Sequence, residues 1–226
     1  MSLFQKLPAG LLSMAVMASG GPAQAPGARS PEVWRATMAL LPKGDPERGA
    51  KLHQSLFCAS CHGERGTAPT PNWPHLSGQK PLATVKALLD FQEGRRGDAA
   101  PARLMGAAVQ GVGLRESADL AAFYAHQPRP SGASGMLAPG LVRNGDPARL
   151  ITPCASCHGA AGQGGRYEAG ALAGQHAAYL AAAMRGFRDG SRTSDLQRSM
   201  RQPLARMSDP EIEAIATYYA GLRSAP

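Results

Sequence analysis

The sequence predicts an all-α protein made of two similar domains in tandem. No segment shows the alternation of β-branched and polar residues that is typical of a half-buried strand. Glycine and proline, 27 and 19 of the 226 residues, together exceed a fifth of the chain, which favours ordered loops between short helices over a large sheet. The second half of the chain also repeats the first, and this repeat sets the domain count.

The repeat aligns when the sequence is shifted by 96 residues. The stretch CASCHG occurs at 58–63 and again, letter for letter, at 154–159. A Leu-x-Gly-Gln stretch at 76–79 aligns with another at 172–175. Farther on, at a shift of 95, the segment ADLAAFYA aligns with EAIATYYA. A register held over this distance indicates that one domain was duplicated.

The repeat and the local composition divide the chain into five segments. Between the halves, QPRPSGASG is rich in residues that resist both helix and strand, so we expect a linker there. Each half then has the size of a normal small domain. The expected segments are a signal peptide at 1–25, an N-terminal extension at 26–42, the first domain at 43–126, the linker at 127–135 and the second domain at 136–226.

The N-terminus has the composition of an export signal. Lys6 supplies a positive charge, and the run from Leu7 to Ala18 is mostly apolar. Ala23 and Ala25 are small residues of the kind that signal peptidase accepts. We therefore expect export to the periplasm, with cleavage after Ala25. A cut after Ala18 and an uncleaved apolar anchor are the alternatives.

Helix-start signals and apolar spacing predict the main helices of both halves. Asp45 suits an N-cap, and Pro46 suits the first helical position. Leu82–Phe91 carries apolar residues on one face, and Ala177–Phe187 is its counterpart. The last helix begins within SDPEIEAIATYY, with Asp209 as its cap, and ESADLAAFYA is its partner in the first half.

The first helix of the second half is less clearly marked. GDPARLITP resembles GDPERGAKL, but it lies five residues closer to its cysteine pair. We therefore place this helix earlier, at Met136–Arg143.

The repeated CASCHG contains all four cysteines of the chain, and a C-x-x-C pair has three plausible uses. A redox dithiol normally lies in a βαβ unit, which the sequence lacks. Two pairs could form a four-cysteine zinc site, but zinc leaves the histidine that follows each pair unexplained. Covalent haem attachment explains every residue, because two thiols bond to the haem and the adjacent histidine binds its iron. Cys58, Cys61, Cys154 and Cys157 are therefore the expected attachment sites, with His62 and His158 as iron ligands.

The expected sixth iron ligands are Met105 and Met200. Haem iron that is bound by histidine on one side often takes a methionine sulfur on the other. Met105 lies 19 residues before Tyr124, and Met200 lies 19 residues before Tyr219. The structural alternative, a methionine that fills a gap in the core, suits Met184 and also Met207, just before the final helix.

Longer stretches of the chain resemble a known family. The residues are GDPERGAKL…CASCHG, NWPHLSGQ, GQHAAYLAAAMRGFRDGSRTSD and ARMSDPEIEAIATYYAGL. They resemble the dihaem cytochrome c-four family, exported electron carriers built of two class I cytochrome c domains. The resemblance covers about residues 43 to 224. It implies two covalently attached haem c groups, the axial pairs His62/Met105 and His158/Met200, and haems close enough for internal electron transfer.

The remaining candidate residues have weaker support. His53, His75, His126 and His176 carry no ligand pattern, and each is expected to be an ordinary histidine, for example on the surface. Trp73, Tyr167 and Arg192 are candidates for contact with haem propionates.

The loop after each CASCHG differs between the halves. In the first half, TAPTPNWPHL is stiffened by prolines, and we expect one of its carbonyls to hold His62. The loop GQGGRYEAGAL of the second half is rich in glycine. Looser backbone admits water, so we expect the second haem to have the lower reduction potential.

The number and distribution of charged residues indicate which class of partner the protein binds. Removing residues 1–25 leaves 23 lysines and arginines against 16 acidic residues, with no run of five or six like charges. This argues against a nucleic-acid partner. A mildly basic surface suits an acidic redox protein, such as a membrane oxidase, a cytochrome complex or a dehydrogenase, or peripheral association with an anionic membrane.

The function expected from these features is that of a periplasmic electron carrier between respiratory redox partners. The alternative is a dihaem electron-transfer subunit of a larger dehydrogenase complex, with Ser30–Leu41 as a docking helix. Catalysis is disfavoured, because full His/Met coordination leaves no open position on either iron. No cysteine remains outside the two motifs to serve as the further cysteine that we associate with thiosulfate-oxidising cytochromes.

Overall fold

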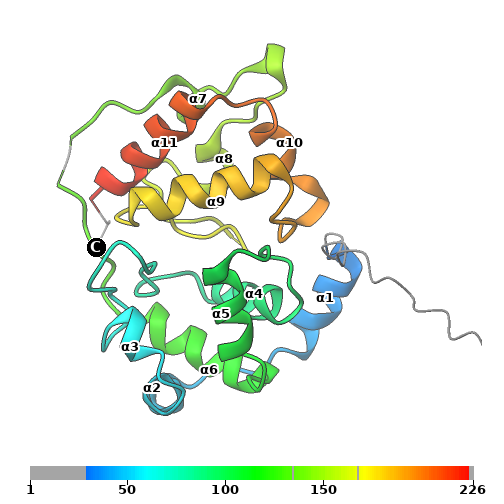
Figure 1. The fold of residues 1–226 in the computed structure, drawn as a ribbon, viewed down its shortest axis with the longest axis vertical. Coiled ribbons are helices and arrows are strands. Elements are labelled where there is room, and N and C mark those ends of the chain that lie inside the picture. Colours follow the sequence, from blue (N-terminus) through cyan, green and yellow to red (C-terminus); the bar gives the residue numbers. More distant parts are fainter. Residues whose placement is uncertain (1–28, 134, 167, 224–226) are drawn as a thin grey trace, which may run out of the picture.

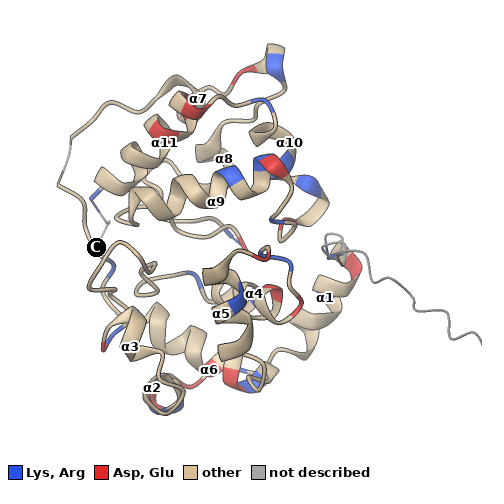
Figure 2. Ribbon diagram, in the orientation of Figure 1, with Lys and Arg blue, Asp and Glu red and all other residues tan. Residues whose placement is uncertain are grey.

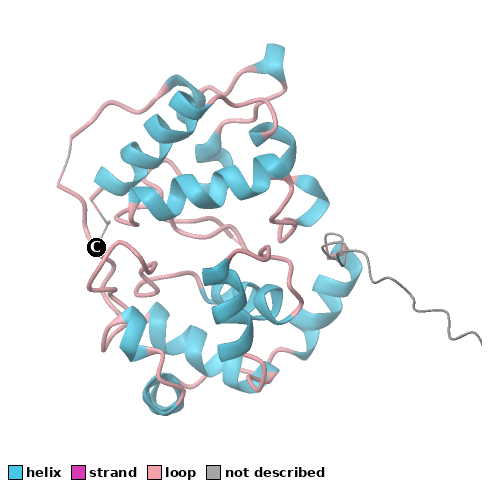
Figure 3. Ribbon diagram, viewed as in Figure 1, coloured by secondary structure: helices cyan, strands magenta, loops and turns pink. Residues whose placement is uncertain are grey.

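The computed structural model describes residues 29–133, 135–166 and 168–223. The expected signal peptide therefore lies outside the described residues, and so does Tyr167. Within the described part, every regular element is helical, and an isolated bridge joins Asp146 to Ile151 (Figure 3). No helix in this part is long and apolar enough to cross a membrane. The all-α expectation is confirmed.

The two halves of the chain form two helical units that lie one above the other in Figure 1. The first half contains α1 (Pro31–Leu40), α2 (Pro46–Ser55), α3 (Ala59–His62), α4 (Pro81–Gln92), α5 (Ala100–Ala108) and α6 (Leu114–Ala125). The second half contains α7 (Gly140–Arg143), η1 (Pro147–Arg149), α8 (Cys154–His158), α9 (Ala177–Asp189), η2 (Leu196–Arg198), α10 (Arg201–Leu204) and α11 (Asp209–Gly221). Basic and acidic residues are interspersed along both halves (Figure 2).

Most predicted helix starts agree with the structure. Helix α2 begins at Pro46, and an Asp45 carboxylate oxygen accepts hydrogen bonds from the first-turn backbone. Helices α4 and α9 occupy the predicted segments and extend slightly beyond them. The cap of α11 is a correction: it is Ser208, whose N–H and hydroxyl both donate to the Glu211 carboxylate. Ser208 thus takes the cap position, and Asp209 is the first helical residue.

The helix predicted at Met136–Arg143 is also a correction. Only Gly140–Arg143 is helical, as the single turn α7, and Pro139 stands before it in an extended conformation. Proline has no N–H to donate and fixes its own φ, so it suits the start of a helix better than its interior. The next segment, Pro147–Arg149, forms a 3₁₀ turn that ends at Leu150, where φ is 54°.

Each half has its own hydrophobic core. In the second half the most deeply buried residues come mainly from α9, α10 and α11. In the first half α2 and α4 pack against α6. The best-buried apolar residues include Val85, Leu120 and Tyr124 in the first half and Leu204, Ile212 and Tyr219 in the second.

Helix α1, the candidate docking helix, packs against its own domain. Its Trp34 is only 2% exposed and contacts Val85 of α4 and Ala121 of α6. Just before the helix, Arg29 forms ion pairs with Asp90 and Glu93. The largest apolar side chain of this helix is therefore buried against its own domain.

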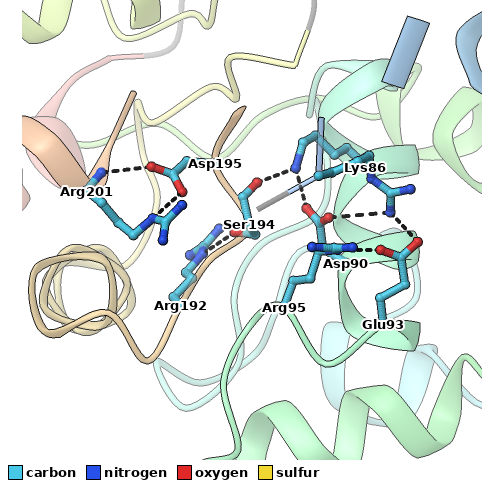
Figure 4. Close-up of polar contacts among 9 residues, drawn as sticks. Lys86, Asp90, Glu93, Arg95, Arg192, Ser194, Asp195 and Arg201 are labelled. Carbon is cyan, nitrogen blue, oxygen red and sulfur yellow. Dashed lines mark hydrogen bonds and ion pairs between the residues drawn. The ribbon is translucent and has the colours of Figure 1, made fainter. Parts of the chain in front are cut away.

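A buried polar network joins the two halves (Figure 4). Lys86 on α4 donates to the backbone carbonyl of Ser194 in the second half and pairs with Asp90 at 2.5 Å. The backbone N–H of Thr193 donates to the carbonyl of Arg95. These contacts join α4 and the loop after it to the segment that precedes Met200 in the second half.

Candidate haem sites

Both CASCHG motifs have the same local geometry. The histidine is the last residue of a short helix, α3 in the first half and α8 in the second. A glycine with positive φ follows, Gly63 at 74° and Gly159 at 83°. A Cβ at Gly63 would lie 2.2 Å from the Thr67 carbonyl oxygen, so only glycine fits this reversal of the chain.

The two histidines are held in the same tautomer. The Nδ1 of His62 lies 2.9 Å from the carbonyl oxygen of Pro74, and the Nδ1 of His158 lies 2.7 Å from that of Gly170. A carbonyl can only accept, so each Nδ1 carries the proton and each Nε2 presents a lone pair. Burial lowers the pKa of both rings and keeps them neutral. Neutral imidazole with a free Nε2 is the form that binds iron.

The first-half carbonyl agrees with the sequence prediction, since Pro74 lies in the proline-rich loop. The glycine-rich loop of the second half supplies an equivalent carbonyl at Gly170. The Nε2 of His62 is buried and has no hydrogen-bond partner among the described residues. An unpartnered buried nitrogen is costly unless something binds it, which fits an iron ligand.

Both motifs open on one large cavity of about 940 Å³. All four cysteines, His62 and His158 line it. Much of the remaining wall is apolar, including Leu88, Phe91, Val109, Leu120, Leu180, Phe187, Leu204 and Ile215. The walls of this cavity suit a large apolar group. Such a group would add apolar bulk to a chain in which only 5% of the residues are aromatic.

Met105 and Met200 line the same cavity, each within its own half. Met105 lies on α5, a helix that the sequence analysis did not predict, and packs against the first core. Met200 stands just before α10 and packs against the second core. The buried Asp195 carboxylate accepts from the N–H groups of Met200 and Arg201, which fixes this segment. Met207 is buried in the second core, as expected of a gap-filling residue, and it lines the cavity as well, as does Met184.

The cysteines do not have the character of a redox dithiol. Burial raises the pKa of the Cys58 and Cys154 thiols, whereas reactive dithiols have a lowered pKa. No disulfide joins any of the four. The described residues also contain no cluster of three or more His, Cys, Asp or Glu side chains that could hold a metal ion.

A pair of arginines adds positive charge to the cavity. Arg96 and Arg192 both line it, and each guanidinium stacks on an aromatic ring, that of Phe91 or Phe187. Burial and the neighbouring Arg96 lower the pKa of Arg192 to about 10. Tyr179 accepts a hydrogen bond from Arg96 at 2.8 Å. This excess of cationic groups suits carboxylates such as haem propionates.

Arg192 was expected here from the sequence, whereas Arg96 and Tyr179 were not. The signal for Arg96 was present, since a shift of 96 residues aligns it with Arg192. Trp73, the other described candidate, lines the cavity with its ring 6.4 Å from that of His62.

Of the four histidines that carry no ligand pattern, three have structural roles. His53 is completely buried, with Nδ1 2.9 Å from the Tyr124 hydroxyl and Nε2 2.9 Å from the Gly63 carbonyl. His75 and His176 stack across the domain interface with ring centroids 4.0 Å apart. Only His126 is exposed.

Comparison with known proteins matches both halves separately. The cytochrome c family profile matches residues 46–126 and again residues 148–222. Cytochrome c4 of Thiocapsa roseopersicina is 37% identical over 185 residues, which cover 79% of this chain and 93% of that protein. The chain belongs to the dihaem cytochrome c4 family. It therefore carries two covalently bound haem c groups and is an electron-transfer protein with redox protein partners.

Two further similarities extend this result. The crystal structure of reduced cytochrome c4 from Pseudomonas stutzeri superposes with a TM-score of 0.70 at 32% identity, covering 80% of this chain and all of that chain. A protein named thiosulfate dehydrogenase electron acceptor, from Thiomonas intermedia, is 29% identical, covering 76% of this chain and 82% of its own length. Two tandem cytochrome c domains are thus confirmed.

Proposed function

We propose that this cytochrome c4 family member is an exported, periplasmic carrier that shuttles electrons between respiratory redox partners. Its axial pairs are His62/Met105 and His158/Met200, and its haems are attached at the two cysteine pairs. The observation that carries the proposal is the shared geometry: two imidazoles, each with Nδ1 held by a backbone carbonyl, line one largely apolar cavity, and Met105 and Met200 line it at matching positions of the two halves, alongside Met184 and Met207.

Haem iron supplies reversible one-electron chemistry, and the protein residues set its conditions. The carbonyls of Pro74 and Gly170 orient the two imidazoles through Nδ1. The apolar wall excludes water and favours the reduced, less charged state. Arg96 and Arg192 offer charge-assisted hydrogen bonds to the propionates.

The same coordination argues against catalysis by this chain. A histidine and a methionine on each iron leave no position for a substrate. The purified protein is therefore expected neither to turn over hydrogen peroxide nor to be reduced by thiosulfate unless a dehydrogenase is added.

Carbon monoxide tests the axial assignment, because it binds ferrous haem only at an open position. The reduced wild-type protein should bind none. Met105→Ala and Met200→Ala should each bind one molecule per chain, and each should lose about half of the weak iron–sulfur band of the oxidised protein. Met207→Ala, which alters a buried methionine that also lines the cavity, is the control and should bind none. A Met105→Ala protein that keeps the full band and excludes carbon monoxide would contradict the first assignment.

The second candidate function is that of an electron-accepting subunit for a larger dehydrogenase. The relative named thiosulfate dehydrogenase electron acceptor favours it. Co-purification from the native host distinguishes the two: a subunit elutes in a stable complex with the dehydrogenase, whereas a carrier elutes alone.

A further inference from the structure

Two glutamines hold the domains together in a reciprocal way. In the first half, the Gln79 amide donates to the Ala171 carbonyl at 3.1 Å and accepts from the Ala171 N–H at 2.7 Å. In the second half, the Gln175 amide donates to the His75 carbonyl at 2.9 Å and accepts from the His75 N–H at 3.0 Å. A shift of 96 aligns both the glutamines and their targets, so one contact is made twice, in opposite directions.

The local structure builds each glutamine into place. Each follows a glycine with positive φ, Gly78 at 63° and Gly174 at 70°. Both glycines donate their N–H to the carbonyl of a tyrosine in the last helix of their own domain. Each amide oxygen also accepts from the next residue's N–H, at 2.9 Å and 3.0 Å. Because backbone N–H only donates and C=O only accepts, these partners fix the orientation of both amides.

The clamped residues are the immediate neighbours of the histidine-holding carbonyls. Pro74 provides the carbonyl that holds His62, and the N–H of the same peptide group belongs to His75. Gly170 provides the carbonyl that holds His158, and the N–H of that peptide group belongs to Ala171. A peptide group is planar and rigid, so one amide plane joins each histidine to the glutamine of the other domain.

We propose that Gln79 and Gln175 are positioning residues that act across the domain interface, each on the proximal histidine of the opposite domain. Gln175 of the second half orients and polarises the peptide group that holds His62, and Gln79 of the first half does so for His158. The proposal rests on the axial role of these histidines that was proposed above.

Polarisation gives the direction of the effect. A hydrogen bond accepted from a peptide N–H makes the carbonyl oxygen of the same group a stronger acceptor. That oxygen then draws more strongly on the Nδ1–H, which makes the imidazole a better donor to iron and favours the oxidised state. Removing the glutamine should therefore raise the reduction potential of the haem in the other domain.

The test is a pair of methionine substitutions, Gln79→Met and Gln175→Met, in the full dihaem protein. Methionine preserves the volume at the interface and removes all three amide hydrogen bonds, two of which cross the interface. The matched control is Gln92→Met, since the Gln92 amide also donates to backbone carbonyls but only within the first domain. A redox titration followed by NMR, with haem methyl resonances assigned to each domain, gives the two potentials separately.

The expected result is a crossed pattern. Gln79→Met should raise the reduction constant of the second haem about two- to fivefold, which is about 20–40 mV because tenfold is 59 mV for one electron. Gln175→Met should do the same for the first haem. Any shift in Gln92→Met should fall on the first haem, in its own domain. Shifts confined to the mutated domain, or equal shifts of both haems, would overturn the proposal.

Hydrogen exchange gives a second readout that does not depend on potential. Gln175→Met should speed solvent exchange of the His62 Nδ1–H, and Gln79→Met that of the His158 Nδ1–H, with the other histidine unchanged. Unchanged exchange at both sites would also overturn the proposal. An error in the axial assignment would give a different result. If His62 and His158 were not iron ligands, His62→Ala and His158→Ala would leave the iron spectra unaltered.

Discussion

Replacing His53 with leucine should unfold the first domain at a much lower temperature. His53 lies on α2, is completely buried, and makes two hydrogen bonds of 2.9 Å. One ties α2 to Tyr124 on the last helix of the domain. The other ties it to Gly63, directly after the haem-attachment motif. Leucine fills most of the space but satisfies neither partner.

The magnitude follows from the two groups left behind. A buried polar group that loses its partner costs about 1–3 kcal/mol. Tyr124 retains a contact with Cys58, and the Gly63 carbonyl still accepts from the Gly66 N–H at 3.1 Å, so both shares fall at the low end. The sum is therefore about 2 kcal/mol. At about 4–8 °C for each kcal/mol in a domain of this size, the first-domain transition should fall by about 8–16 °C.

Thermal unfolding of the oxidised protein, followed by the haem spectrum of each domain, is the assay. The matched control is His126→Leu, an exposed histidine one residue beyond α6, which should change stability by less than about 0.5 kcal/mol. The second-domain transition should not move in either variant. If His53→Leu unfolds within about 0.5 kcal/mol of the wild type, the buried hydrogen-bonded role of this histidine is refuted.

Three further predictions concern the second domain and the charges in the cavity. The Arg149 guanidinium, followed by the Ser208 N–H, lowers the pKa of Glu211 from 4.5 to about 2. The stabilisation that the ionised Glu211 carboxylate gives the folded protein is thus complete above pH 4.5 and is lost as the pH falls toward 2. The difference in melting temperature between wild type and Glu211→Gln should therefore vanish over that range. Arg192→Gln removes a positive charge from the cavity and should favour the oxidised state by roughly 1 kcal/mol, seen as a lower potential in a redox titration; an unchanged or higher potential would contradict it. The second haem should have the lower potential, because the glycine-rich loop after its CASCHG motif admits water more readily than the proline-rich loop of the first half; Met105→His and Met200→His assign each wave, and a lower wave from the first domain would refute the order.

The haem-attachment chemistry could be predicted because it is local in sequence. Two thiols and a histidine within five residues carry it, and the repeat removes the ambiguity of a short motif. Helix starts were predictable for the same reason, as at Asp45, where the cap and the proline are adjacent. At Ser208 the prediction was off by one residue, because both serine and aspartate are good caps and only the Glu211 contact decides between them.

The roles of His53 and of the two glutamines could not be read from the sequence. His53 is buried because α6 packs across α2 and brings Tyr124 to it, a contact between residues 71 apart. The glutamines were visible as a repeated feature, but their targets lie about 100 residues away in the other domain. Such contacts depend on how the two halves dock, which local patterns do not specify.

Intact mass of the acid-denatured protein tests the central claim most directly, because only covalently attached haem survives denaturation. The exported wild-type chain should carry two haems. A Cys58→Ala/Cys61→Ala variant and a Cys154→Ala/Cys157→Ala variant should each carry one. A wild-type mass with one haem or none, obtained with a functional haem-attachment system, would contradict the account of two tandem haem domains.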